Sequence, residues 1–213
     1  MPQPLSRVQP DANVFLANAG QRVLRQRPQL AVNAIEAIAS SANVEAFLLK
    51  LFVSLMGGNK GTAARIYLAL EIQSAKSVAI TEAVKCLSNA DHQRLVIALV
   101  QLAKRNQKRR DRIAHYVWGI SPHPKLQDAL LLADPKSLVN DNIDMEHIFV
   151  YRETDFLTLI TDNDRLCGYW HKLRWIIEGH VANKDGRLYD ELCREPEVRE
   201  ILNRLAAQDQ RTP

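Results

Sequence analysis

The residues best suited to chemistry lie between positions 110 and 115, where the order is Arg-Asp-Arg-Ile-Ala-His. In a helix each residue turns by about 100°, so Asp111 and His115 would lie on one face, with Arg112 about one turn before His115. Arg110 would lie about 140° from His115 around the axis, an angle that a long arginine side chain can partly bridge. The segment therefore predicts an imidazole flanked by guanidinium groups and one carboxylate on a rigid support.

This group of side chains suits cleavage of a phosphodiester bond in RNA. Histidine exchanges protons near neutral pH, so His115 is a candidate to take a proton from a 2′-hydroxyl or give one to the leaving oxygen. Guanidinium groups bind phosphate through paired hydrogen bonds and stabilise the charge on its oxygens. This route needs no metal, and the sequence has no acidic cluster or Cys/His ligand spacing that would hold one. We expect no metal and no cofactor.

Positive charge is concentrated around the same segment, within a chain of net charge +4. The candidate RNA-binding residues are Lys104, Arg105, Lys108, Arg109, Arg112 and the adjacent Tyr116. A basic run is also typical of a helix face that simply faces solvent, and a histidine on such a helix is more often solvated than catalytic. Composition and spacing alone leave both interpretations open.

The segment resembles the motif of the HEPN superfamily, which is an arginine, a polar residue, three further residues and a histidine. The residues that follow, Tyr116-Val117-Trp118-Gly119, resemble the AH-x-x-WG continuation of bacterial HEPN-like proteins. The resemblance implies a four- or five-helix bundle with the motif on a late helix. Members commonly form homodimers in which two motifs face each other across one cleft. Many are metal-independent endoribonucleases of toxin–antitoxin and phage-defence systems, and others are non-catalytic RNA- or nucleotide-binding modules.

By this resemblance Arg110 would contact the scissile phosphate, His115 would act as general acid and base, and Asp111 would orient one of them. Asp111 departs from the family pattern, in which this position is more often asparagine, and its negative charge would weaken the hold on phosphate. The chain is thus a candidate RNA endonuclease, with RNA, a second copy and an antitoxin protein as expected partners. The alternatives are a non-catalytic RNA-binding or regulatory module, and a helical interaction protein with a solvated basic run.

The elements that position this segment are predicted to be mainly helical. Eight glycines, nine prolines and 6% aromatic residues favour helices over a β-sandwich. Apolar residues recur at helical spacing on both sides of the basic run, and this pattern predicts one helix from about 90 to 118. Further helices are expected over 31–40, 44–55, 62–70 with Thr62 as N-cap, 77–87 and 156–181, and after Gly186 with a break near Pro196.

Two apolar runs, at 129–132 and 147–151, predict a small two-stranded β ribbon. We expect a HEPN-like helical bundle with this ribbon over residues 29–182. Residues 1–28, which are rich in proline at their start, are expected to be a loose lead-in. Residues 183–213 are expected to form a C-terminal helical extension of the same domain.

The sequence predicts a cytoplasmic protein without a membrane partner. Its three cysteines, Cys86, Cys167 and Cys193, are odd in number and far apart, which suggests neither a disulfide framework nor a zinc site. The N-terminus lacks the charged and apolar regions of a signal peptide. The longest apolar segments, such as Ala46 to Met56 with its interrupting Lys50, are too short to cross a bilayer.

Overall fold

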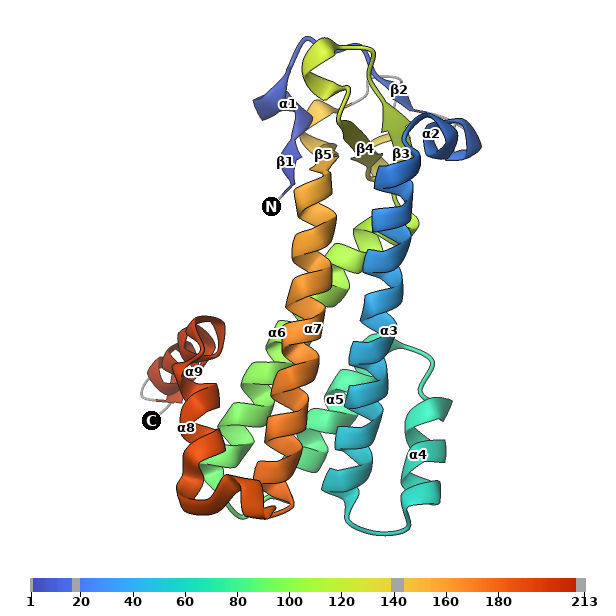
Figure 1. Ribbon diagram of the computed structural model, residues 1–213. Coiled ribbons are helices and arrows are strands. Elements are labelled where there is room, and N and C mark those ends of the chain that lie inside the picture. The colour runs from blue at the N-terminus through green and yellow to red at the C-terminus, as the bar shows by residue number, and fades with distance from the viewer. Residues whose placement is uncertain (1, 17–19, 139–143, 210–213) are drawn as a thin grey trace. The chain divides into compact units, whose positions relative to one another are not determined.

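The computed structural model describes residues 2–16, 20–138 and 144–209 and confirms the mainly helical class (Figure 1). The chain forms two compact units, which are interleaved in sequence. Unit 1 comprises Met1–Ser41 and Asn106–Asp162, and unit 2 comprises Ala42–Arg105 and Asn163–Pro213. The boundaries fall within three long helices, α3 (Pro28–Met56), α6 (Ala90–His115) and α7 (Glu153–Ile177). The three-part division expected from the sequence stays a prediction.

Unit 1 contains an antiparallel sheet with the strand order β1-β5-β4-β3-β2. The strands are β1 (Gln3–Pro4), β2 (Phe15–Leu16), β3 (Val117–Ile120), β4 (Ala129–Ala133) and β5 (Ile148–Arg152). The expected ribbon is present, because β4 and β5 pair with Leu131 opposite Val150. The sheet is larger than this ribbon, since β3 pairs with the other edge of β4. The two-residue strands β1 and β2 form its outer edges, β1 beside β5 and β2 beside β3.

Both faces of the sheet in unit 1 are covered, which explains the unbroken apolar run of β4. Side chains alternate along a strand, so Leu130 and Leu132 face one way while Ala129, Leu131 and Ala133 face the other. The first face packs against helical residues of α2 (Gly20–Gln26), α3, α6 and α7. The second face packs against Leu5, Ala12 and Leu126, which come from the N-terminal segment and from η1 (Pro124–Leu126).

The N-terminal segment is therefore not a loose lead-in where the structure describes it. Gln3 and Pro4 pair with β5, and α1 (Leu5–Val8) follows directly. Leu5 is fully buried beneath the sheet. The three prolines of the first ten residues obscured this segment, because a two-residue strand and a four-residue helix leave no periodic pattern to detect.

The helix that carries the candidate motif ends earlier than its apolar stripe predicts. α6 ends at His115, and Val117, expected as a core residue of the helix, lies in β3 opposite Ala133. Two hydrogen bonds close the helix: the Tyr116 amide donates to the Arg112 carbonyl, and the Trp118 indole Nε1 donates to the Ile113 carbonyl at 2.9 Å. Trp118 thus satisfies a carbonyl at the helix end that would otherwise lack a partner.

The helix α3 was expected as two pieces that start after Pro28, but it is continuous and begins at Pro28 itself. Proline suits the first position of a helix, because its fixed φ is helical and its missing amide would have no partner there. With 29 residues, α3 is long and apolar enough to cross a membrane by length and composition alone. This is weak evidence, since the core helix of a soluble protein passes the same test. The cytoplasmic location stays a prediction.

Unit 2 consists of helices in its described part. Besides its portions of α3, α6 and α7 it contains α4 (Lys60–Ala69), α5 (Gln73–Val84), η4 (Val181–Gly186), α8 (Arg187–Arg194) and α9 (Pro196–Asp209). The N-cap of α4 is Asn59 and not Thr62, because the Asn59 side chain accepts from the Thr62 amide. Its core includes Leu48, Phe52, Tyr67, Leu95, Leu99, Trp170, Leu173, Leu192 and Ile201.

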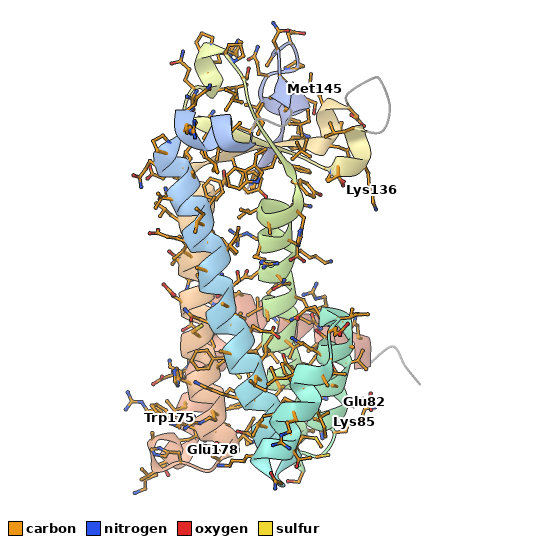
Figure 2. All side chains as sticks on the ribbon, turned by 90° about the vertical axis from the view of Figure 1, so that its right-hand side faces the viewer. Glu82, Lys85, Lys136, Met145, Trp175 and Glu178 are labelled. Atoms are coloured by element: carbon orange, nitrogen blue, oxygen red, sulfur yellow. The ribbon has the colours of Figure 1, made fainter. Side chains whose placement is uncertain are left out.

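Two pairs of side chains labelled in Figure 2 help to locate these elements. Trp175 lies in the last turn of α7 and Glu178 directly after that helix, both in unit 2, and the Trp175 ring stacks on His180 with centroids 5.4 Å apart. Lys136 belongs to η2 (Pro135–Leu138) and Met145 to η3 (Met145–His147), short helices that the structure describes between β4 and β5 in unit 1.

Candidate functional site

Arg110 and Asp111 form an ion pair on the last two turns of α6. The Arg110 Nη1 lies 3.2 Å from the Asp111 Oδ1, and the Gln107 side chain donates to the same oxygen at 2.8 Å. The side chains of Arg110 and Asp111 are 30% and 45% exposed, so the pair is open to solvent. Of the two roles open to Asp111, the structure shows contact with Arg110 and none with His115.

His115 is the last residue of α6 and its side chain is exposed. Among the described residues its imidazole has no hydrogen-bond or ion-pair partner. Arg110 and His115 do not contact each other within the chain. The helix places both on the surface of unit 1, and the Trp118 hydrogen bond fixes the helix end from which the imidazole projects.

Arg112 lies against an aromatic surface supplied by β5. Its guanidinium carbon is 4.7 Å from the centroid of the Phe149 ring, a cation–π distance. The Tyr116 ring also lies beside Phe149, at 6.2 Å, and its hydroxyl donates to the Asp134 Oδ2 at 3.3 Å. Burial raises the pKa of Tyr116 and Asp134 raises it further, while Arg112 acts in the opposite direction.

Arg109 is held in an ion pair within unit 1. Its Nη1 donates to the Asp162 Oδ2 of α7 at 2.5 Å, and the side chain is only 16% exposed. A carboxylate already occupies the donors that would bind a phosphate, so Arg109 is suited to holding α6 and α7 together. This placement favours a structural role for one of the predicted RNA-binding residues.

The remaining predicted cations divide between the two units. Lys108 is exposed in unit 1. Lys104 and Arg105 belong to unit 2, where Lys104 is exposed and Arg105 lies 3.8 Å from Glu200 of α9. The boundary between the two units therefore divides the predicted basic run, and its residues are not assigned to one binding surface.

No protein-family model, curated protein or solved structure matches this chain. The HEPN resemblance accordingly depends on residues 110–119 and on the helical context of the motif. Within the described residues, no group of three or more His, Cys, Asp or Glu side chains is arranged to hold a metal ion.

Two residues near the motif, Phe149 and Tyr151, were not predicted to belong to the site. They lie two apart on β5, so both side chains face the helical side of the sheet, where Arg112 meets Phe149. Tyr151 is buried, and burial raises its pKa to about 12. The strand predicted at 147–151 already implies that Phe149 and Tyr151 lie on the same face of the sheet. The sequence does not indicate which helix that face contacts.

A cavity of about 470 Å³ in unit 1 lies apart from the candidate motif residues. Its lining comes from the starts of α3 and α7 and from neighbouring turns. The charged groups in the lining are Arg27, Asp128, Arg152 and Glu153. Arg152 already pairs with Asp128 and donates to the Lys125 carbonyl, so its guanidinium is occupied.

Proposed function

We propose that the C-terminal end of α6 binds RNA and cleaves its phosphodiester backbone as a metal-independent, HEPN-type endoribonuclease. The proposal is carried by one observation: Arg110, Arg112 and His115 are all accessible to solvent on the last two turns of one helix. Trp118 fixes the end of that helix, so the imidazole stands on a rigid support. Such a group needs little reorganisation when it receives a phosphate.

In the proposed reaction the 2′-oxygen of RNA attacks the adjacent phosphorus and the bond to the 5′-oxygen breaks. A base removes the proton of the 2′-hydroxyl, and an acid delivers a proton to the departing 5′-oxygen. The products are a 2′,3′-cyclic phosphate and a 5′-hydroxyl. His115 suits either proton transfer, and guanidinium groups stabilise negative charge on the non-bridging oxygens.

The reaction needs both a base and an acid, whereas the segment 110–119 supplies one histidine. A homodimer in which two α6 ends face one cleft would supply both, with the imidazole of each copy in one role. The HEPN resemblance supports the same arrangement. It also supports an antitoxin-like protein partner and a role in toxin–antitoxin or phage-defence systems.

The test is cleavage of single-stranded RNA in EDTA, with the product ends identified by mass spectrometry. His115→Ala is expected to lower the cleavage rate by about 100-fold or more, the usual contribution of a general acid or base. His171→Ala is the matched control, because His171 is an exposed histidine of α7 in unit 2 and should leave the rate unchanged. Intact RNA across a substrate panel, or equal rates for both variants, would contradict the proposal.

A non-catalytic RNA-binding module is the second candidate. It is favoured by the ion pair between Arg110 and Asp111, because the carboxylate occupies the arginine that the HEPN motif assigns to the scissile phosphate. This candidate predicts salt-sensitive RNA binding without cleavage, and the same binding by His115→Ala as by the wild type.

A further inference from the structure

The three arginines nearest the motif differ in what they contact. The Arg109 guanidinium pairs with Asp162, and the Arg110 guanidinium pairs with Asp111. Within the described residues, no carboxylate pairs with Arg112, whose contacts are the face of the Phe149 ring and the Tyr116 hydroxyl. Arg112 is thus the one guanidinium of the three whose positive charge no described carboxylate neutralises.

The stacking of Arg112 leaves most of its hydrogen-bond donors available, since the Tyr116 hydroxyl is the one hydrogen-bond partner described for its guanidinium. A guanidinium that lies over an aromatic ring uses its flat face, while its N–H groups point outward in the plane of the group. Those N–H groups form the fork that matches two oxygens of a phosphate. Arg112 is partly exposed, as is Phe149, so an anion can reach this edge from solvent.

The position of Arg112 along α6 also favours contact with the same phosphate as His115. Residues three apart are neighbours on a helix surface, whereas residues five apart lie about 140° from each other. A phosphate bound by Arg112 would therefore lie on the same side of α6 as the imidazole of the same chain. A phosphate on Arg110 lies further around the helix and next to the negative charge of Asp111.

We propose that Arg112, and not Arg110, is the arginine that contacts the RNA phosphate, with Phe149 as its positioning residue. Tyr116 packs beside the Phe149 ring, and its hydrogen bond to Asp134 holds it there. The inference rests on the proposed function only in taking RNA as the ligand, and it does not depend on whether the RNA is cut.

The test is the binding of a fluorescent 2′-O-methyl RNA oligonucleotide, measured by anisotropy over a series of salt concentrations. This probe lacks the 2′-hydroxyl and stays intact. Arg112→Ala is expected to weaken binding by about tenfold and to reduce the slope of log affinity against log salt by about 0.7, the value for one phosphate contact on a single strand. Arg110→Ala is expected to weaken binding less than Arg112→Ala does, because the Arg110 guanidinium is already paired with Asp111.

Arg65→Ala is the matched control for a general loss of positive charge. Arg65 is an exposed arginine of α4 in unit 2 without a described partner. Its removal is expected to leave the affinity within about twofold of the wild type.

Two further variants separate a phosphate contact from a structural role. Arg112→Lys keeps the charge, so its salt slope should match the wild type even if its affinity falls. Phe149→Leu keeps the arginine but removes its platform, so it should lower the affinity several-fold without changing the salt slope. If Arg112 only stabilised the fold, Arg112→Lys would not restore the wild-type salt slope. The salt slope of this variant therefore distinguishes the two roles.

The inference is overturned if Arg110→Ala weakens binding more than Arg112→Ala does, if Arg112→Lys fails to restore the salt slope, or if the wild type does not bind the oligonucleotide. Cleavage of unmodified RNA is measured alongside. Binding that depends on Arg112 without any cleavage would refute the nuclease and support this inference. Cleavage that depends on Arg110 and not on Arg112 would support the nuclease and refute this inference.

Discussion

Replacing Tyr151 by phenylalanine removes one hydroxyl from the core of unit 1 and leaves the ring in place. Tyr151 is 2% exposed, and its Oη has no hydrogen-bond partner among the described residues. A buried hydroxyl without a partner costs roughly 1–3 kcal/mol. Because the ring keeps its stacking on Phe156, we expect Tyr151→Phe to raise the free energy of unfolding by about 1 kcal/mol at neutral pH.

The same variant should alter the response of stability to alkaline pH. Burial raises the pKa of Tyr151 from 10.0 to about 12, while the nearby Arg112 acts in the opposite direction. The unfolded chain therefore ionises first, so the stability due to this group is complete below pH 10 and is lost as the pH rises from about 10 to 12. A pKa difference of two units corresponds to about 3 kcal/mol of stability that the wild type loses over this pH range. Tyr151→Phe has no hydroxyl to ionise at this position, so it does not show this loss.

The assay is urea unfolding followed by circular dichroism, at neutral pH and at several points above pH 10. Other buried tyrosines ionise alike in both proteins, so the difference between wild type and variant isolates Tyr151. Tyr116→Phe is the control, because the Tyr116 hydroxyl donates to Asp134 and its removal should destabilise the protein by about 1 kcal/mol or less. A loss of about 1 kcal/mol or more in Tyr151→Phe at neutral pH would refute the reasoning, since it would mean that the hydroxyl is satisfied.

Two other substitutions test how the structure supports the site. Trp118→Phe removes the hydrogen bond to the Ile113 carbonyl, and we expect it to lower the free energy of unfolding by about 1–2 kcal/mol, measured by urea unfolding. It should also lower the rate of RNA cleavage more than the affinity for RNA, because it loosens the end of the helix that carries His115. Leu5→Ala should cost about 2–5 kcal/mol, as expected for a fully buried leucine, and a loss below about 0.5 kcal/mol would show that the N-terminal segment is not part of the core.

The parts of the fold that the sequence predicts are those with a repeating local pattern. The apolar stripe of α6 and the paired runs of β4 and β5 are both repeating patterns, and both elements are present. The end of α6 was placed too late, because Val117 continues the helical spacing by chance. What stops the helix is a side-chain hydrogen bond from Trp118, which periodicity does not report.

The candidate site was predictable in its location but not in its contacts. The sequence places Arg109, Arg110 and Arg112 together, and it gives no means of ranking them. Their ranking depends on partners that are distant in sequence, since Asp162 lies 53 residues from Arg109 and the Phe149 ring comes from β5. Only the tertiary structure shows which guanidinium is already occupied.

The interleaving of the two units sets the order in which they can be completed during synthesis. Unit 1 needs the segment that ends at Asp162 before it can cover the apolar face of its first segment, which ends at Ser41. At about 5–20 residues per second, the ribosome takes about 6–24 s to make the residues in between. Unit 2 likewise waits for the residues from Asn163 onward to cover Leu48, Phe52 and their neighbours. The nascent chain therefore exposes two incomplete apolar cores at once until α7 has been made.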